Sequence, residues 1–434
     1  MAIQEARGET MWEKGAEALR EGEFQGVGWV EHVRVLKTIQ FFVLRIPSGD
    51  LLQCTNFAEE LAGTVGALTA ESAVKVSGVL QRNESVKLNQ RELILKGIEV
   101  LNHADPLPVQ DNANPDARYQ WRFLDLRSPQ NNLVFQVQTW IEHAMREFWI
   151  ENDFIEIHSP KLMGVPSESR AELFTTTYFD QPAYLAQSPQ LYKQYAIAGG
   201  FNRVFEIGPV FRADPSATIR HTAEFTSVDA EIAWIESHED IMAFEERWLR
   251  YVIEKVAARY GDRIREVFKT EVVVPSLPFP RIPIAEAYEI IRASGHEIAR
   301  NGDLDAEGEA RIARHVMETH GHEFVFITDY PIAVRPFYHM RDGDSTRSFD
   351  LLWKGMEITT GAQREHRYDV LTRQAEEKGI TLAHIEWYLD CFRLGCPPHG
   401  GFGLGLSRVL MNILGLGNVR EATFISRTRN RLIP

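Results

Sequence analysis

A polar, proline-containing segment divides this chain into two parts with different residue patterns. Residues 103–120 read HADPLPVQDNANPDARYQ and combine three prolines with no hydrophobic periodicity, which is typical of a linker. A chain of 434 residues is expected to form two or three domains. The sequence therefore predicts an N-terminal domain over residues 1–104, a linker over 105–120 and one large domain over 121–434.

The N-terminal part has the pattern of a small β-barrel. Residues 25–102 contain five short runs in which apolar and polar residues alternate and valine and aromatic residues are frequent. A helix-like stretch at 58–68 lies between the third run and the fourth. Five strands with a helix after the third fit a closed barrel of the oligonucleotide-binding kind (OB-fold), although this pattern by itself also fits other small barrels.

The larger part predicts an α+β domain. Long amphipathic helices are expected at 133–154 and at 238–261, the second beginning at Ser237 or His238, and further helices at 367–378 and 403–414. Strand-like runs lie at 154–158, 184–186, 203–207 and 226–234. Because helices and strands do not alternate strictly, a mostly antiparallel sheet flanked by helices is favoured over a doubly wound parallel sheet.

Composition excludes several classes of function. No run of about 18 apolar residues is present to cross a membrane, and the charged N-terminus does not resemble a signal peptide, so a cytoplasmic protein is expected. Three scattered cysteines predict neither a disulfide framework nor a zinc site. The net charge of −14 argues against non-specific nucleic-acid coating, but five arginines and one acid in residues 408–434 leave a local basic surface open.

Four segments place polar and charged residues inside strand-like runs, where burial is costly unless a ligand or a partner compensates. In a predicted hairpin over 208–231, alternation puts Arg212 and Asp214 on one face and Phe225, Ser227 and Asp229 on one face of the return strand. Arginine suits a phosphate and an aromatic ring suits a base. A solvated hairpin with cross-strand ion pairs is the alternative interpretation.

The other three segments are each ambiguous when taken alone. Residues 348–366 combine carboxylates with hydroxyl groups, which suits Mg²⁺ held together with substrate phosphates but also an edge strand with surface charges. Residues 397–411 are glycine-rich, which permits close backbone approach to a ligand, yet they lack the ending of a P-loop. Residues 186–194 are a dense polar cluster that also reads as a helix start, with Ser188 as N-cap and Pro189 at the first helical position.

Taken together, these segments resemble the class II aminoacyl-tRNA synthetases. The hairpin FRAD followed by Arg-His and the strand EFTSVDAE resemble motif 2, GGFGLGLSR resembles motif 3, and Pro160 after FIEIHS resembles the dimer-forming motif 1. QSPQLYKQ, GAQREHRYD and PPHGGFGLG narrow the resemblance to aspartyl-tRNA synthetases of the archaeal type, in subclass IIb, whose members include non-discriminating enzymes. The resemblance extends over about residues 20–434.

This resemblance implies a homodimeric enzyme that uses ATP and Mg²⁺ to activate L-aspartate and then charges tRNA(Asp), with tRNA(Asn) left open as a second substrate. It implies catalytic roles for Arg212 and Arg408 and a metal site at Glu357 and Thr360. The implied ATP-binding residues are Arg212, Asp214, Arg220, His221, Thr222, Phe225, Glu357, Gly405, Leu406, Ser407 and Arg408. The implied aspartate-binding residues are Glu168, Gln187, Gln190, Lys193, Arg212, Asp229, Thr360 and Arg364. In the barrel, Phe42 and Gln53 are expected to contact anticodon bases.

Lysine and arginine together suit a side-chain carboxylate, so aspartate is favoured over asparagine. A buried Lys193 facing a neutral amide would lack a counter-charge. Three features depart from the family pattern: Ser407 replaces the acid before the motif 3 arginine, Asp214 replaces a glutamate, and residues 167–170 lack two glycines. Two alternatives therefore stay open: a paralogue that makes aspartyl-adenylate or aspartyl-tRNA for a specialised pathway, and a non-catalytic RNA-binding protein.

Overall fold

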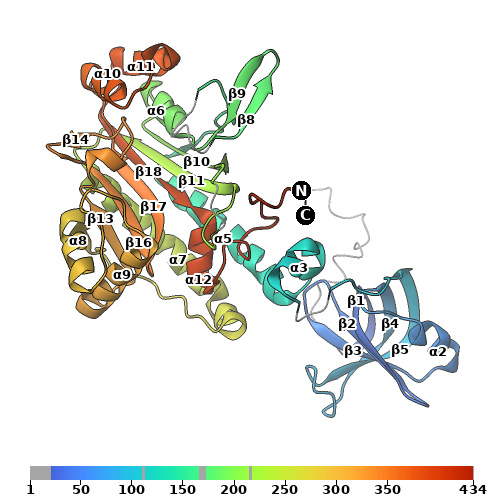
Figure 1. The fold of residues 1–434 in the computed structure, drawn as a ribbon. Helices are drawn as coiled ribbons and strands as arrows, with labels where there is room; N and C mark the ends of the chain where they lie inside the picture. Colours follow the sequence, from blue (N-terminus) through green and yellow to red (C-terminus); the bar gives the residue numbers. More distant parts are fainter. Residues whose placement is uncertain (1–20, 110–112, 166–172, 215–217, 434) are drawn as a thin grey trace. The chain divides into compact units, whose positions relative to one another are not determined.

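The computed structural model describes residues 21–109, 113–165, 173–214 and 218–433 (Figure 1). The chain divides into two compact units, Met1–Trp121 and Arg122–Pro434, so the division falls one residue after the predicted start of the large domain. Part of the predicted linker is helical: α3 (Pro115–Gln120) begins with proline, and the Asn114 side chain accepts a hydrogen bond from the Ala117 amide at 2.9 Å. Such a cap satisfies a helix-end donor that would otherwise lack a partner.

The first unit contains the expected five-stranded barrel. The strands close in the order β1-β2-β3-β5-β4, and the only parallel neighbours among the described barrel strands are β3 and β5. The elements are β1 (Gly22–Val35), β2 (Gln40–Arg45), β3 (Leu51–Asn56), α2 (Glu59–Gly66), β4 (Ala73–Arg82) and β5 (Arg91–Asn102). The helix between the third strand and the fourth and the OB-fold barrel are both confirmed.

The register of β2 separates its two phenylalanines. Phe42 is 1% exposed and packs in the barrel core with Leu44 and Cys54, so its ring is not available to stack on a base. The partly exposed Phe41 lies on the opposite face of the strand, because successive side chains in a strand alternate between faces. Gln53 pairs with Val43 in the neighbouring strand, which puts Gln53 on the same outer face as Phe41. The expected role of Phe42 is therefore corrected: in this barrel Phe41, not Phe42, is the ring beside Gln53.

The second unit is built on an eight-stranded sheet of order β12-β13-β16-β17-β18-β11-β10-β6. Its inner neighbours are antiparallel, whereas the pairs β12–β13 and β10–β6 at its two edges are parallel. The predicted α+β class is thus confirmed. The sheet strands are β6 (Ile155–Glu156), β10 (Arg203–Phe211), β11 (Glu224–Ala233), β12 (Arg281–Pro283), β13 (Phe324–Thr328), β16 (Ser348–Trp353), β17 (Met356–Gln363) and β18 (His399–Gly405).

Three helices cover one face of this sheet: α5 (Pro129–Glu151), α7 (His238–Phe268) and α12 (Leu406–Leu414). Their apolar sides share one core with inward residues of β11 and β18, such as Val228, Ala230 and Phe402. A capping box fixes the start of α7, because Ser237 and Asp240 bond to each other's backbone amides. In Figure 1 these helices lie against the sheet around β17 and β18. These helices do not cover the opposite face of the central strands.

The second unit also contains smaller elements. They are α4 (Arg122–Asp125), β7 (Leu162–Met163), β8 (Thr175–Tyr178), β9 (Gln181–Leu185), α6 (Gln190–Ala198), α8 (Ile284–Ala293), α9 (Ala306–His320), η1 (Ile332–Val334), β14 (Arg341–Asp342), β15 (Ser345–Thr346), α10 (Tyr368–Glu377), η2 (Leu382–His384) and α11 (Glu386–Arg393). Among the described residues, no helix is long and apolar enough to cross a membrane; the cytoplasmic location stays a prediction.

Two expected helix starts are wrong. The helix expected to begin at Gly403 begins at Leu406, because His399–Gly405 is the central strand β18. The helix after residue 188 begins at Gln190, with Pro189 at the N-cap position and the Ser188 hydroxyl accepting from the Gln190 amide at 3.2 Å. At 399–405 the pairing of β18 with β11 and β17 replaces the expected first turn of the helix.

Candidate active site

A cavity of about 400 Å³ opens on the uncovered face of the sheet, in the second unit. Its walls come from the β10–β11 hairpin, from β17, from the β18–α12 junction and from a loop at 336–339. Most of the predicted site residues line it: Gln190, Arg212, Asp214, Arg220, His221, Thr222, Phe225, Asp229, Glu357, Thr360, Arg364, Gly405, Ser407 and Arg408. The four segments singled out by their polar residues therefore meet at one site.

The glycine run in β18 serves packing inside the site. Gly403 pairs with Asp229 on β11, and a Cβ at position 403 would lie 3.0 Å from Oδ1 of Asp229. At Gly401 a Cβ would run into the Ala230 carbonyl and the Glu231 carboxylate. Only glycine leaves space for these two carboxylates beside the strand. The glycines thus make room for acidic side chains of the protein.

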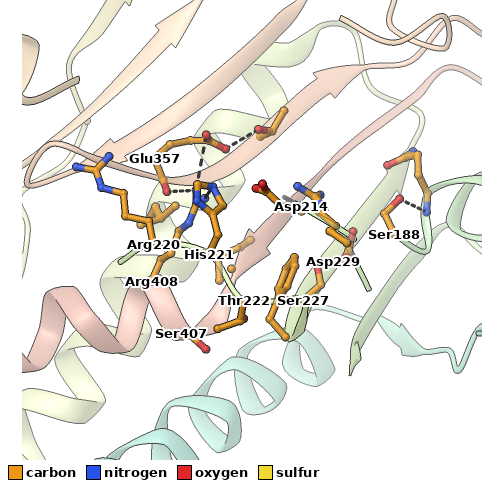
Figure 2. Close-up of a pocket in the computed structure, with 18 of the residues that line it drawn as sticks. Ser188, Asp214, Arg220, His221, Thr222, Ser227, Asp229, Glu357, Ser407 and Arg408 are labelled. Carbon is orange, nitrogen blue, oxygen red and sulfur yellow. Dashed lines mark hydrogen bonds and ion pairs between the residues drawn. The ribbon is translucent and has the colours of Figure 1, made fainter. Parts of the chain in front are cut away.

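Basic side chains gather at one end of the cavity. Nη1 of Arg408 donates to the Glu357 carbonyl at 2.7 Å and lies 3.7 Å from its carboxylate, and Nη2 lies 3.3 Å from Nε2 of His221. Figure 2 shows Arg220, Arg408, His221 and Glu357 close together at this end. Burial, followed by the positive charge of Arg408, lowers the pKa of His221. A neutral imidazole accepts from Arg408, so Arg408 is held in place although residue 407 is serine.

An arginine and an aromatic ring lie next to each other in the cavity wall. The guanidinium of Arg212 lies 5.5 Å from the centre of the Phe225 ring, within the range of a cation–π contact. Backbone pairing holds the arginine, because its amide donates to the Ala223 carbonyl at 2.9 Å. Figure 2 shows Asp214 between the basic end and the end that contains Asp229 and Ser188.

At the other end lies a buried network of opposite charges. Glu231 is 0% exposed, and its carboxylate lies 2.9 Å from Nε of Arg364 and 3.5 Å from Nζ of Lys193. Nζ of Lys193 also lies 2.9 Å from Asp229, which lines the cavity. Burial by itself raises the pKa of Glu231, but the charges of Arg364 and Lys193 outweigh it and leave this pKa below its usual value. Glu231 is therefore ionised and is a counter-charge that both cations share.

Further side chains fix the orientation of Arg364. Its Nη2 donates to Oε1 of Gln190 at 3.1 Å and to the Gly401 carbonyl at 3.0 Å, and Nη1 lies 3.0 Å from Nε2 of His339. Burial, together with the charge of Arg364, holds the pKa of His339 well below its usual range, so this imidazole is neutral and accepts. Such a network pre-orients the guanidinium toward the cavity.

Some cavity residues were missed by the sequence analysis, and some predicted residues lie elsewhere. Tyr338 and His339 line the cavity from a loop. A loop has no hydrophobic periodicity from which the sequence could predict them. Gln187 and Leu406 are 2% exposed and Lys193 is 0% exposed; none of these three lines the cavity. Glu168 lies outside the described residues. Lys193 therefore lies beneath the cavity wall, where it contacts Asp229, which lines the cavity, and not the cavity itself.

The contacts of Glu357 and of the carboxylates near it decide whether a metal ion could bind at this end of the cavity. The Thr360 hydroxyl donates to Oε1 of Glu357 at 2.9 Å, and the Glu357 side chain is 34% exposed. The neighbouring Asp350 is occupied by Arg335, at 2.6 Å. In the part of the chain that the structure describes, no cluster of three or more His, Cys, Asp or Glu residues could hold a metal ion. This donor set suits Mg²⁺ that takes most of its ligands from phosphates and water.

Comparisons with known proteins agree with this geometry. Residues 114–429 match the family described as tRNA synthetases class II (D, K and N). The aspartate–tRNA(Asp) ligase of Pyrococcus abyssi is 40% identical over 430 residues, which cover 96% of this chain and 98% of that protein. The aspartate–tRNA(Asp/Asn) ligase of Methanopyrus kandleri is 42% identical over 426 residues, with coverage of 96% and 97%.

Solved structures show the same fold along both chains. A putative aspartyl-tRNA synthetase from Leishmania major matches with a TM-score of 0.88 and 30% identity, covering 100% of this chain and 96% of that one. Asparaginyl-tRNA synthetase from Pyrococcus horikoshii, complexed with asparaginyl-adenylate, matches with the same TM-score and identity, covering 96% and 97%. The chain therefore belongs to the class II tRNA synthetases of the D, K and N group.

Proposed function

We propose that this protein is an aspartate–tRNA ligase, which activates L-aspartate with ATP to aspartyl-adenylate and transfers the aspartyl group to the 3′ end of tRNA(Asp). The observation that carries the proposal is one cavity with two different ends. Arg220 and Arg408 line a basic end suited to a triphosphate, and Arg364 lines an end suited to a carboxylate. The aspartate-ligase names of the relatives, at about 40% identity over nearly the whole chain, support the same reaction.

The chemistry needs positioning and charge neutralisation, with no protein nucleophile. An oxygen of the aspartate α-carboxylate attacks the α-phosphorus of ATP, a new O–P bond forms, and the bond to the pyrophosphate leaving group breaks. Arg212 lines the same cavity, and its charge can stabilise both the attacking carboxylate and the α-phosphate in the transition state. Arg408 and Arg220 neutralise charge that develops on the pyrophosphate. Phe225 offers a ring for the adenine, next to Arg212.

The buried network accounts for the choice of amino acid. Arg364 presents a fixed guanidinium to the side-chain carboxylate of aspartate, and Asp229 receives the substrate ammonium. Lys193 has no exposed surface, so it acts indirectly, by holding the carboxylates of Asp229 and Glu231 in place. Asparagine would leave the Arg364 charge without a substrate counter-charge, which disfavours it. Arg364 and Asp229 thus offer one positive and one negative partner to the side-chain carboxylate and the ammonium of aspartate.

We infer that Glu357 and Thr360 would hold Mg²⁺ together with ATP phosphates. When bound, the metal would neutralise phosphate charge at the basic end of the cavity. The Thr360 hydroxyl orients the Glu357 carboxylate at 2.9 Å, and the Glu357 carbonyl in turn holds Arg408 at 2.7 Å. One residue therefore links the metal site to the phosphate-binding arginine.

For the tRNA, we propose that the barrel binds the anticodon through Gln53 and, in place of Phe42, through Phe41. A partly exposed ring beside a polar side chain suits stacking and hydrogen bonding to an unstacked base. Charging of tRNA(Asn) as a second substrate is favoured by one observation, the Asp/Asn specificity named for the Methanopyrus kandleri relative. A homodimer through the region of Pro160 is also proposed, because Ile155 and Leu162 beside it are 47% and 49% exposed.

Aspartate-dependent exchange of pyrophosphate into ATP tests the activation step, with asparagine as the control amino acid. We expect exchange with aspartate only. Charging of purified tRNA(Asp) and tRNA(Asn) then separates a ligase from a paralogue that stops at aspartyl-adenylate, and tells single from dual tRNA specificity. Absence of aspartate-dependent exchange in a protein that still binds tRNA would support the non-catalytic alternative and reject the proposed function.

A further inference from the structure

We infer that Glu309 is a positioning residue that holds Arg220 in place for the ATP triphosphate. Glu309 belongs to helix α9, far from the hairpin loop of Arg220 in the sequence. The ion pair joins Nη1 of Arg220 to Oε2 of Glu309 at 2.6 Å, and the Arg220 side chain is 24% exposed whereas that of Glu309 is 10% exposed. The inference rests on the proposed function, because it takes this end of the cavity as the triphosphate site.

The same arginine has a second fixed contact. Its Nη2 donates to the carbonyl of Gly355 at 3.3 Å, in the turn between β16 and β17. That turn lies directly on α9, since a Cβ at Gly355 would come within 3.0 Å of the Ala310 Cα. Gly355 also has a φ of +76°, a backbone conformation that favours glycine. Helix and turn therefore form one rigid support for the guanidinium.

These contacts decide which way Arg220 points. Both anchoring acceptors lie away from the cavity, on α9 and on the turn, while Arg220 itself lines the cavity. A guanidinium has five N–H groups in a planar fork, so two can be used for anchoring while others face a ligand. Figure 2 shows Arg220 beside Arg408 and Glu357. Without Glu309, this long side chain would sample several rotamers, and ordering it would cost free energy when ATP binds.

Glu309 does not line the cavity, and its hydrogen-bonded contact with a cavity residue is the one to Arg220. It is absent from the cavity walls and is 8% exposed. Burial, followed by repulsion from Glu357, raises the pKa of Glu309 to about 7. Binding experiments at pH 8 therefore keep its carboxylate ionised.

The test measures ATP affinity by calorimetry at pH 8, together with KM for ATP and for aspartate in pyrophosphate exchange. Glu309→Ala is expected to weaken ATP binding about tenfold, as for the loss of one charged hydrogen bond, with KM for aspartate changed less than twofold. Glu309→Gln keeps the shape and an acceptor oxygen and is expected to recover part of the loss. Glu307→Ala is the matched control, because Glu307 lies on the same helix and pairs with Arg311 at 2.7 Å, outside the cavity.

A double-mutant cycle separates positioning from a general structural effect. In an Arg220→Ala background, Glu309→Ala is expected to weaken ATP binding no further. Equal losses in both backgrounds, or an ATP affinity in Glu309→Ala no lower than in Glu307→Ala, would overturn the inference. Calorimetry reads ATP binding even if aspartate-dependent exchange is absent, so failure of the proposed reaction and failure of the Glu309 inference give different results. A wild-type chain that does not bind ATP would reject both.

Discussion

The carboxylate of Glu231 lies 2.9 Å from Nε of Arg364 in a place where the two side chains are 0% and 3% exposed. A second cation, Lys193, shares the same carboxylate. Because a buried ion is costly when unpaired, the three side chains form a unit, and the orientation of Arg364 toward the cavity depends on Glu231. Glu231 does not line the cavity, yet we expect it to affect substrate choice through Arg364.

Replacement of this shared carboxylate should damage aspartate recognition. Glu231→Gln leaves two buried cations with one fewer counter-charge, so we expect kcat/KM for aspartate to fall at least about 100-fold and KM for ATP to stay within a few-fold. Pyrophosphate exchange with each substrate varied measures both. Glu224→Gln, an exposed position on the same strand, serves as control and should behave as wild type. Unchanged aspartate kinetics in Glu231→Gln would show that the network is only structural.

Removal of the buried lysine should abolish aspartate activation and leave tRNA binding nearly intact. In Lys193→Ala, the carboxylates of Asp229 and Glu231 lose a cationic partner at 2.9 and 3.5 Å. This end of the cavity then becomes more negative and repels the side-chain carboxylate of aspartate. Aspartate-dependent exchange and a tRNA gel-shift measure the two effects. An aspartate affinity close to that of wild type would mean that Lys193 has no part in recognition.

The two phenylalanines of β2 should separate RNA binding from folding. Phe41→Ala removes a partly exposed ring, and we expect tRNA binding to weaken about tenfold, as for the loss of one base stack, with adenylate formation unchanged. Phe42→Ala removes a ring that is 1% exposed and should destabilise the barrel by about 3 kcal/mol or more. Filter binding of tRNA and thermal denaturation distinguish them. Weakened tRNA binding in a stably folded Phe42→Ala variant, with Phe41→Ala normal, would reverse the assignment.

Glu245 should contribute a fall in thermal stability as the pH rises between about 5 and 8. This side chain of α7 is fully buried, and burial raises its pKa to about 8. Between its unfolded value and about 8 the folded chain keeps a proton that the unfolded chain has released, so stability decreases with increasing pH by up to about 1.4 kcal/mol per unit. Glu245→Gln should lose this part of the pH dependence, seen as a smaller change in Tm between pH 5 and pH 8. An unchanged difference would mean that Glu245 is not protonated in the folded chain.

Much of the site could be predicted because its residues occur in local patterns. Alternation in β11 puts Ser227 and Asp229 on one face whatever the rest of the fold does, and the carboxylates and arginines of 208–231 and 348–366 are costly to bury alone. The barrel could be predicted for the same reason, since five alternating strands and a helix after the third strand are compatible with only a few folds. Local periodicity and the cost of burying charge are properties of short segments, so the sequence by itself determined the two-part organisation, the α+β class and the four segments that form the cavity wall. The resemblance to class II synthetases supplied most of the individual residues.

Contacts between distant segments were decided only by the tertiary structure. Which of Phe41 and Phe42 faces outward depends on the register of β2, and a shift of one residue exchanges the two faces. The glycines at 401 and 403 could serve a ligand or a neighbouring strand, and only the pairing with β11 assigns them to Glu231 and Asp229. The support of Arg220 by Glu309, 89 residues away in the chain, has no local pattern, because a long-range ion pair arises from the packing of a helix against a sheet.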